Sequence, residues 1–158
     1  MKVKFDVTAI GAAVAAILSL VAIILFSSGY NGSQGYFEMQ FAGLSYVVGF
    51  GVVTIILAAA AIVLPMINVE GTAKKAINIA VDVIIVVMCI FFCLMALYAA
   101  KSSVYEMALT WASELHINEP YMITACNNAL ASIILSIVAM IVVGVTACIT
   151  KTIFAKKN

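Results

Sequence analysis

Charged residues are scarce in this sequence. Only 9 % of its 158 residues are Asp, Glu, Lys or Arg, whereas 66 % are hydrophobic. A soluble domain carries about a quarter charged residues, so the shortage excludes an ordinary soluble domain. The formal net charge of +1 and the lack of a long basic block exclude a nucleic-acid partner. The composition predicts a protein whose surface faces the lipid bilayer.

Catalytic and metal-binding motifs are also missing. The four cysteines include no CxxC pair, and His116 is the one histidine. Cys89 and Cys93 are one helical turn apart, but two ligands with no further His or Cys at their depth do not make a zinc site. No HExxH, glycine-rich phosphate loop or paired-carboxylate motif occurs. We therefore expect no enzyme activity, no cofactor and no metal.

Long apolar runs fill most of what remains. Four runs have the 20 or so residues that an α-helix needs to cross about 30 Å of hydrocarbon. Pro65 ends the second run, because proline cannot continue a helix. The sequence predicts one all-α integral membrane domain, residues 1–158, with spans at about 7–26, 44–66, 76–100 and 125–150.

Basic residues predict the orientation of these spans. Seven of the eight lie on one side, and only Lys101 lies on the other; the seven are Lys2, Lys4, Lys74, Lys75, Lys151, Lys156 and Lys157. The positive-inside rule then places both termini and the loop at about 67–75 in the cytoplasm, and we expect the cell (plasma) membrane. Short connections make neighbouring spans antiparallel, which predicts an up-down four-helix bundle.

The two outer segments, at about 27–43 and 101–124, differ in pattern. The first begins with Gly, Ser and Asn, which is typical of a flexible loop, and it contains the glycosylation sequon Asn31-Gly-Ser33. The second has apolar residues at helical spacing, with Thr110 among the polar residues elsewhere on the surface. It predicts a short outer helical segment that either continues span three or lies on the interface. The apolar positions are Val104, Met107, Ala108, Trp111 and Leu115.

Aromatic side chains gather on the outer side. All six tyrosines and Trp111 map to the outer ends of the spans. One interpretation is an aromatic belt at a single membrane interface. The other is that some of these residues form a surface for a partner, since aromatic residues dominate binding hot spots. The candidate partner surface is Tyr105, Trp111, Glu114 and His116.

Small residues form a face on several spans. Lipid tails give helices no hydrophobic reason to associate, so small side chains and polar contacts must hold them together. The stripe in span one is Thr8, Gly11, Ala12, Ala15, Ser19 and Ala22, and in span four Ala129, Ser132, Ser136, Ala139, Ala147 and Thr150. Span two offers Gly49, Gly51 and Ala58 to Ala61.

Asp82 is a carboxylate inside the third apolar run. An acid at mid-bilayer costs about 2.5–3.5 kcal/mol, so its position calls for a reason. At about 100° per residue it shares a stripe that we expect to face the bundle, level with Ala12 or Ala13, Ala60 or Ala61, and Gly144. The stripe consists of Gly71, Lys75, Asn78, Asp82, Cys89, Cys93, Ala96 and Ala100.

Two interpretations of Asp82 stay open. It is either part of a proton or cation path, or a structural carboxylate bonded to Asn78, Thr146 or Thr150 or paired with Lys75. The candidate intramembrane polar site is therefore Asp82, Asn78 and Lys75.

Four spans with both termini inside are also the layout of claudins, tetraspanins and MARVEL-domain proteins. The cysteine motifs of the first two are absent, and no residue motif indicates the third. The leading hypothesis is a non-enzymatic membrane protein that acts through a protein partner or as a homo-oligomer. The alternative is an oligomeric channel or transporter that uses Asp82.

Overall fold

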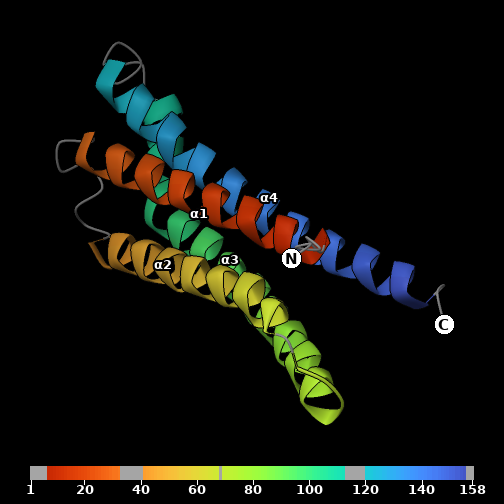
Figure 1. Cartoon of the computed structure of the whole chain (residues 1–158). Coiled ribbons are helices and arrows are strands. Elements are labelled where there is room, and N and C mark those ends of the chain that lie inside the picture. Colours follow the sequence, from red (N-terminus) through yellow and green to blue (C-terminus); the bar gives the residue numbers. More distant parts are fainter. Residues whose placement is uncertain (1–6, 33–40, 68, 113–119, 156–158) are drawn as a thin grey trace.

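The computed structural model describes residues 7–32, 41–67, 69–112 and 120–155, and the regular structure in these ranges is helical. The chain forms α1 (Val7–Gly32), α2 (Phe41–Val63), the 3-10 turn η2 (Leu64–Met66), α3 (Thr72–Ala112) and α4 (Pro120–Ala155). Consecutive helices run antiparallel in an up-down bundle, with α1 beside α4 and α2 beside α3 (Figure 1). All four are long and apolar enough to cross a bilayer. The chain is thus a four-span helical membrane protein.

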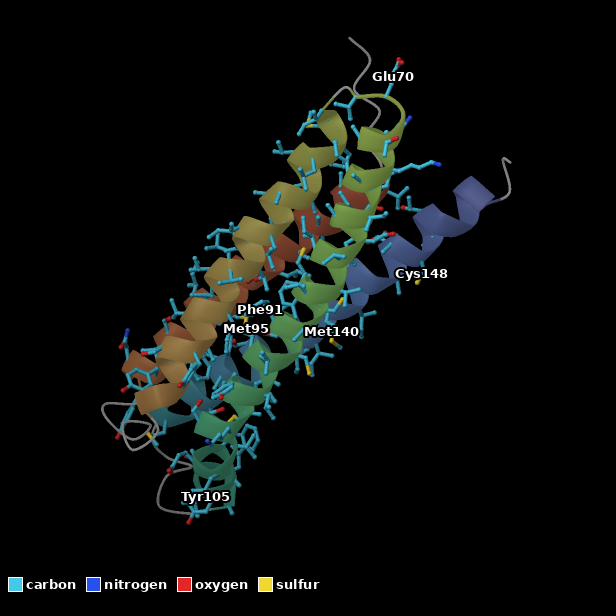
Figure 2. The ribbon with its side chains drawn as sticks, turned by 90° about the horizontal axis from the view of Figure 1, so that it is seen from below. Glu70, Phe91, Met95, Tyr105, Met140 and Cys148 are labelled. Carbon is cyan, nitrogen blue, oxygen red and sulfur yellow. The ribbon has the colours of Figure 1, made fainter. Side chains whose placement is uncertain are left out.

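The two ends of the bundle differ. We call one the tyrosine end, where α1 and α3 finish and α2 and α4 begin, and the other the terminal end, where α1 begins and α4 finishes. The described aromatic residues of the predicted outer set all lie toward the tyrosine end: Tyr30, Tyr46, Tyr98, Tyr105, Trp111 and Tyr121. At the terminal end α4 finishes well away from the turn between α2 and α3 (Figures 1 and 2).

The turn between α2 and α3 depends on two residues. Pro65 lies in η2, directly after α2 ends at Val63, as its missing N–H predicts. Gly71 has φ +65° and precedes the first residue of α3. Only glycine adopts this left-handed conformation without a steric cost, so it lets the chain reverse direction in a short connection.

Small and large side chains are divided between helices. The buried residues of α1 and α4 are mostly Ala, Gly, Ser and Thr, which confirms the stripes expected in spans one and four. The buried face of α3 instead carries Val81, Ile85, Met88, Phe92 and Met95. Large side chains from α3 thus fill the space that small ones leave, as close packing requires.

Buried hydroxyl groups connect the helices. The hydroxyl oxygens of Ser19 on α1 and Thr54 on α2 lie 2.8 Å apart. Both hydroxyl groups donate to the carbonyl oxygen of Gly51, at 3.1 and 2.7 Å. Ser132 on α4 donates to the carbonyl oxygen of Ala22 at 2.8 Å. Each interhelical bond of this kind is worth about 0.6 kcal/mol in a bilayer. They contribute more to the choice of helix partner than to stability.

Glycines mark the closest approaches between helices. A Cβ atom at Gly11 would collide with the Thr146 side chain of α4, and one at Gly29 would lie 2.8 Å from the carbonyl oxygen of Ala125. Gly51 of α2 is buried against Ile23 of α1. Gly49, which we expected on the same face, is exposed with no atom within 4 Å of an added Cβ. That part of the expectation was wrong because Gly49 lies outside the interface.

The expected helix boundaries need several corrections. α1 continues to Gly32, so the Gly-, Ser- and Asn-rich residues up to Gly32 are helical and Asn31 lies in its last turn. Packing overrides their weak helix propensity, because Gly29 sits against α4. α3 begins at Thr72 instead of residue 76, and α4 begins at Pro120 instead of residue 125. Proline fits there, since the first residue of a helix needs no N–H bond.

The outer helical segment is not separate. α3 runs without interruption for 41 residues, or about 60 Å, which exceeds the hydrocarbon thickness by a factor of two. Residues 101–112 therefore continue span three and do not bend onto the interface. Figure 1 shows that the ends of α3 and α4 extend beyond the ends of α1 and α2. We call this extension, residues 104–112 and 120–123, the α3–α4 tip.

Candidate functional site

Asp82 is half-buried near the terminal end of α3. Its neighbour Val81 belongs to a buried core cluster that includes Ala12 and Ala61. Gly144 is half-buried with no atom within 4 Å of an added Cβ. Two of the small residues expected at this level thus share a core cluster with the residue next to Asp82 in the sequence.

The polar stripe of α3 faces the core only in part. Its Lys75, Asn78 and Cys93 are exposed, Asp82, Cys89 and Ala100 are half-buried, and Ala96 is buried, whereas most of the core face is formed by the large apolar residues described above. Cys89 lies on the α4 side, with its Sγ 3.9 Å from the carbonyl oxygen of Met140. The stripe follows the flank of α3 next to α4, because the core needs the larger side chains to fill its volume.

The three residues of the candidate intramembrane polar site differ in their exposure. Lys75 and Asn78 lie on the first turns of α3 and are exposed, while Asp82 is half-buried and makes a polar contact within the protein. Thr146 donates its hydroxyl to its own helix, to the carbonyl oxygens of Val142 and Val143 at 2.7 and 3.1 Å.

Thr150, the other hydroxyl that the sequence offered to Asp82, belongs to a contact between α1 and α4. It donates to the carbonyl oxygen of Thr146 at 2.9 Å and accepts from Thr8 at 2.8 Å. Both threonines are buried at the terminal end. These bonds fix the first described turn of α1 against α4.

The position of Asp82 along α3 can be measured against Lys101. The 19 residue steps from Asp82 to Lys101 correspond to about 28 Å of helix, close to the thickness of the hydrocarbon layer. No charged residue lies between the two. A bilayer centred on this stretch places both charges at its boundaries, where a charge costs far less than at the centre. This position favours the structural interpretation of Asp82.

Cysteines do not assemble into a site within the described residues. Cys126 is buried, Cys89 is half-buried, and Cys93 and Cys148 are exposed. No group of three or more His, Cys, Asp or Glu side chains in the described part of the chain could hold a metal ion. Figure 2 shows Cys148 on the part of α4 that has diverged from α3.

An aromatic cluster joins α2 and α3 near the tyrosine end. The ring of Tyr98 lies 4.4 Å from that of Tyr46 and 5.6 Å from that of Phe50, centroid to centroid. Phe50 also contacts Phe91 at 5.6 Å, and the Lys101 Nζ lies 6.0 Å from the Tyr98 ring centroid. Aromatic pairs and a nearby cation suit a membrane boundary, so this cluster supports the belt interpretation for Tyr46 and Tyr98.

The α3–α4 tip carries the described part of the candidate partner surface. Tyr105 is 69 % exposed and Trp111 is 47 % exposed, and Figure 2 places Tyr105 at the far end of α3. Glu114 and His116 lie outside the described residues. Thr110, which we expected on the surface, is fully buried, because this end of α3 packs against α4 through Met107 and Thr110.

The expected apolar positions of the tip do not share one environment. Met107 is buried, Val104, Ala108 and Trp111 are exposed, and Leu115 lies outside the described residues. The available signal was the line of Ser103, Met107 and Thr110 at i, i+4 and i+7, which continues the small-residue contacts of α4. Leu109, also exposed, was not singled out.

No family model, curated protein or solved structure matches this chain.

Proposed function

We propose that this protein is a small non-enzymatic membrane protein that acts through protein contacts, as an accessory subunit or a membrane organiser. The observation that carries the proposal is the α3–α4 tip. One side of it is buried through Met107 and Thr110, and the other side presents Tyr105, Leu109 and Trp111 to the outside. Exposed aromatic anchors on a rigid helix are the usual centre of a protein interface.

The proposed orientation places both termini in the cytoplasm of the cell membrane. The distribution of the eight lysines supports it. Among the described residues, Lys74, Lys75 and Lys151 lie toward the terminal end and Lys101 lies near the tyrosine end, and in the sequence the other four precede α1 or follow α4. The α3–α4 tip is then on the outer side. A partner would contact it from that side or within the membrane beside α3.

Purification in a mild detergent tests the proposal. We expect the wild-type protein to co-purify with a partner at fixed stoichiometry. In the double variant Tyr105→Ala/Trp111→Ala the association constant should fall about tenfold for each 1.4 kcal/mol of binding free energy that the two side chains supply. The matched control is Ile17→Ala/Ile56→Ala, which removes two side chains that are each 62 % exposed on α1 and α2. Equal recovery of the partner with both variants would contradict a role for the tip.

The alternative function is an oligomeric channel or transporter that uses Asp82. The observation in its favour is that the carboxylate of Asp82 is half-buried, next in the chain to the core residue Val81. Under our proposal, liposomes that contain only this protein pass protons and cations no faster than empty liposomes. Asp82→Asn then leaves partner recovery unchanged. A flux that disappears in Asp82→Asn, with Asn78→Ala as a control on the same helix, would favour transport instead.

A further inference from the structure

One face of α3 is exposed along nearly the whole helix. Its members are apolar or small and uncharged, and each is exposed: Ile79, Val83, Val86, Ile90, Cys93, Leu97, Val104, Ala108 and Trp111. We call this set the α3 seam. It runs about 48 Å along the helix axis, from near the terminal end to the α3–α4 tip.

The spacing of the seam fits a pair of parallel helices. From Ile79 to Leu97 the steps alternate between four and three residues, and they alternate again from Val104 to Trp111. Alternating steps of three and four residues keep one line of side chains facing a partner helix. Ala108 is small enough to let two backbones approach closely at the tip. The seam is therefore shaped for another helix as well as for lipid.

The height of the α3–α4 tip above the membrane indicates what covers the α3 seam. Lys101 marks one boundary of the hydrocarbon layer, and Trp111 lies ten residues, or about 15 Å, beyond it. The headgroup layer on each side is only about 5–8 Å thick. Lipid tails can cover Ile79 to Leu97 but cannot reach Trp111. An exposed apolar helix face at that height needs a protein partner to exclude water from it.

Charge favours a second copy of the same chain as that partner. The seam carries no acidic residue, so two identical faces can meet without opposing carboxylates. Lys101 falls in line with the seam, but its ammonium group lies near the Tyr98 ring on the α2 side. Glu106 is half-buried on the opposite side of the tip. Two copies related by a two-fold axis would therefore bring together surfaces without carboxylates, with each Lys101 ammonium group near its own Tyr98 ring.

We propose that the protein forms a parallel homodimer through the α3 seam, with its two-fold axis along the membrane normal. This inference rests on the proposed function, because it names the partner at the same tip. In such a dimer each seam residue faces its own counterpart. The two copies of Cys93 would then lie close enough for their sulfur atoms to bond, which requires Cα atoms 4.4–6.8 Å apart.

Cysteine cross-linking tests the dimer with the natural sequence. The full chain is reconstituted at high dilution in phosphatidylcholine vesicles and oxidised with copper phenanthroline. We expect a disulfide-linked dimer on a non-reducing gel that is lost in Cys93→Ser and kept in Cys148→Ser. Cys148 is the matched control, since it is also exposed but belongs to α4. A dimer lost only in Cys148→Ser, or no dimer at all, would overturn the proposal.

A second pair of variants tests the tip in the Cys93→Ser background. Ala108→Cys lies on the seam and is expected to restore the cross-link, whereas Glu106→Cys, on the other side of the same turn, is not. Restoration by both or by neither would overturn the seam. The two proposals can fail separately. If a different protein is recovered at fixed stoichiometry through the tip and neither cross-link forms, the homodimer is contradicted and the accessory function is supported.

Discussion

Replacing Gly29 with valine is expected to lower the free energy of unfolding by about 3 kcal/mol, the upper end of what overpacking a close contact costs. A Cβ atom at this position would lie 2.8 Å from the carbonyl oxygen of Ala125. That oxygen belongs to the backbone of α4 and cannot rotate away, so the two helices must separate. Their separation also weakens the contact between Phe26 and Ala129 in the tyrosine-end core.

Equilibrium unfolding in mixed micelles or bicelles measures this effect, and Gly49→Val is the matched control. Gly49 is helical and exposed, and an added Cβ there meets no atom within 4 Å. The control should change stability by less than about 0.5 kcal/mol, as surface substitutions usually do. If both variants lose the same stability, the cost comes from glycine replacement in a helix and not from the α1–α4 contact.

Replacing Phe92 with alanine is expected to cost about 3 kcal/mol, the lower end of the range for Phe→Ala in soluble cores. Phe92 is fully buried among small residues of α1, α2 and α4 and large ones of its own helix. In a membrane the separated helix still surrounds the ring with apolar lipid tails, so the transfer contribution is largely absent. The lost packing and the cavity remain, because small neighbours cannot fill the space.

The control for this variant is Ile56→Ala on α2, which removes a side chain that is 62 % exposed. Thermal unfolding of both proteins in the same detergent gives the comparison. A small rescue by xenon or benzene, which occupy dry cavities of this kind, would identify the cavity as the cause in Phe92→Ala. A loss of stability for Ile56→Ala as large as for Phe92→Ala would contradict the assignment of the core face.

Apolar run length and small-residue spacing are sufficient to predict much of this fold. Run length gave the four spans, and the stripes of α1 and α4 gave the packing faces, since both depend on local composition. The core face of α3 could not be predicted in the same way. Large apolar residues surround that helix on all sides, and which of them are buried depends on the volumes that the other helices leave. We chose the polar stripe instead, and it lies on the flank.

The tip shows a second limit of sequence reasoning. Val104, Met107 and Trp111 have similar hydrophobicity, and helical spacing groups them, yet only Met107 contacts α4. The angle at which α3 meets α4 decides this, and the angle follows from contacts more than ten residues away. Of the candidate site, the sequence located Asp82, Tyr105 and Trp111 on the right helix. It did not indicate that Lys75 and Asn78 are more exposed than Asp82.

The contact between α1 and α4 has a consequence for biosynthesis. Ser132 bonds to Ala22 across 110 residues, and Thr8 bonds to Thr150 across 142. Of the four described helices, the first to be synthesised therefore binds the last. Before α4 is complete, α1 can already bond to α2 through Ser19 and Thr54, but the part of its small-residue face that packs on α4 has no α4 to cover it. A chain that stops before α4 is complete would leave that part of α1 uncovered.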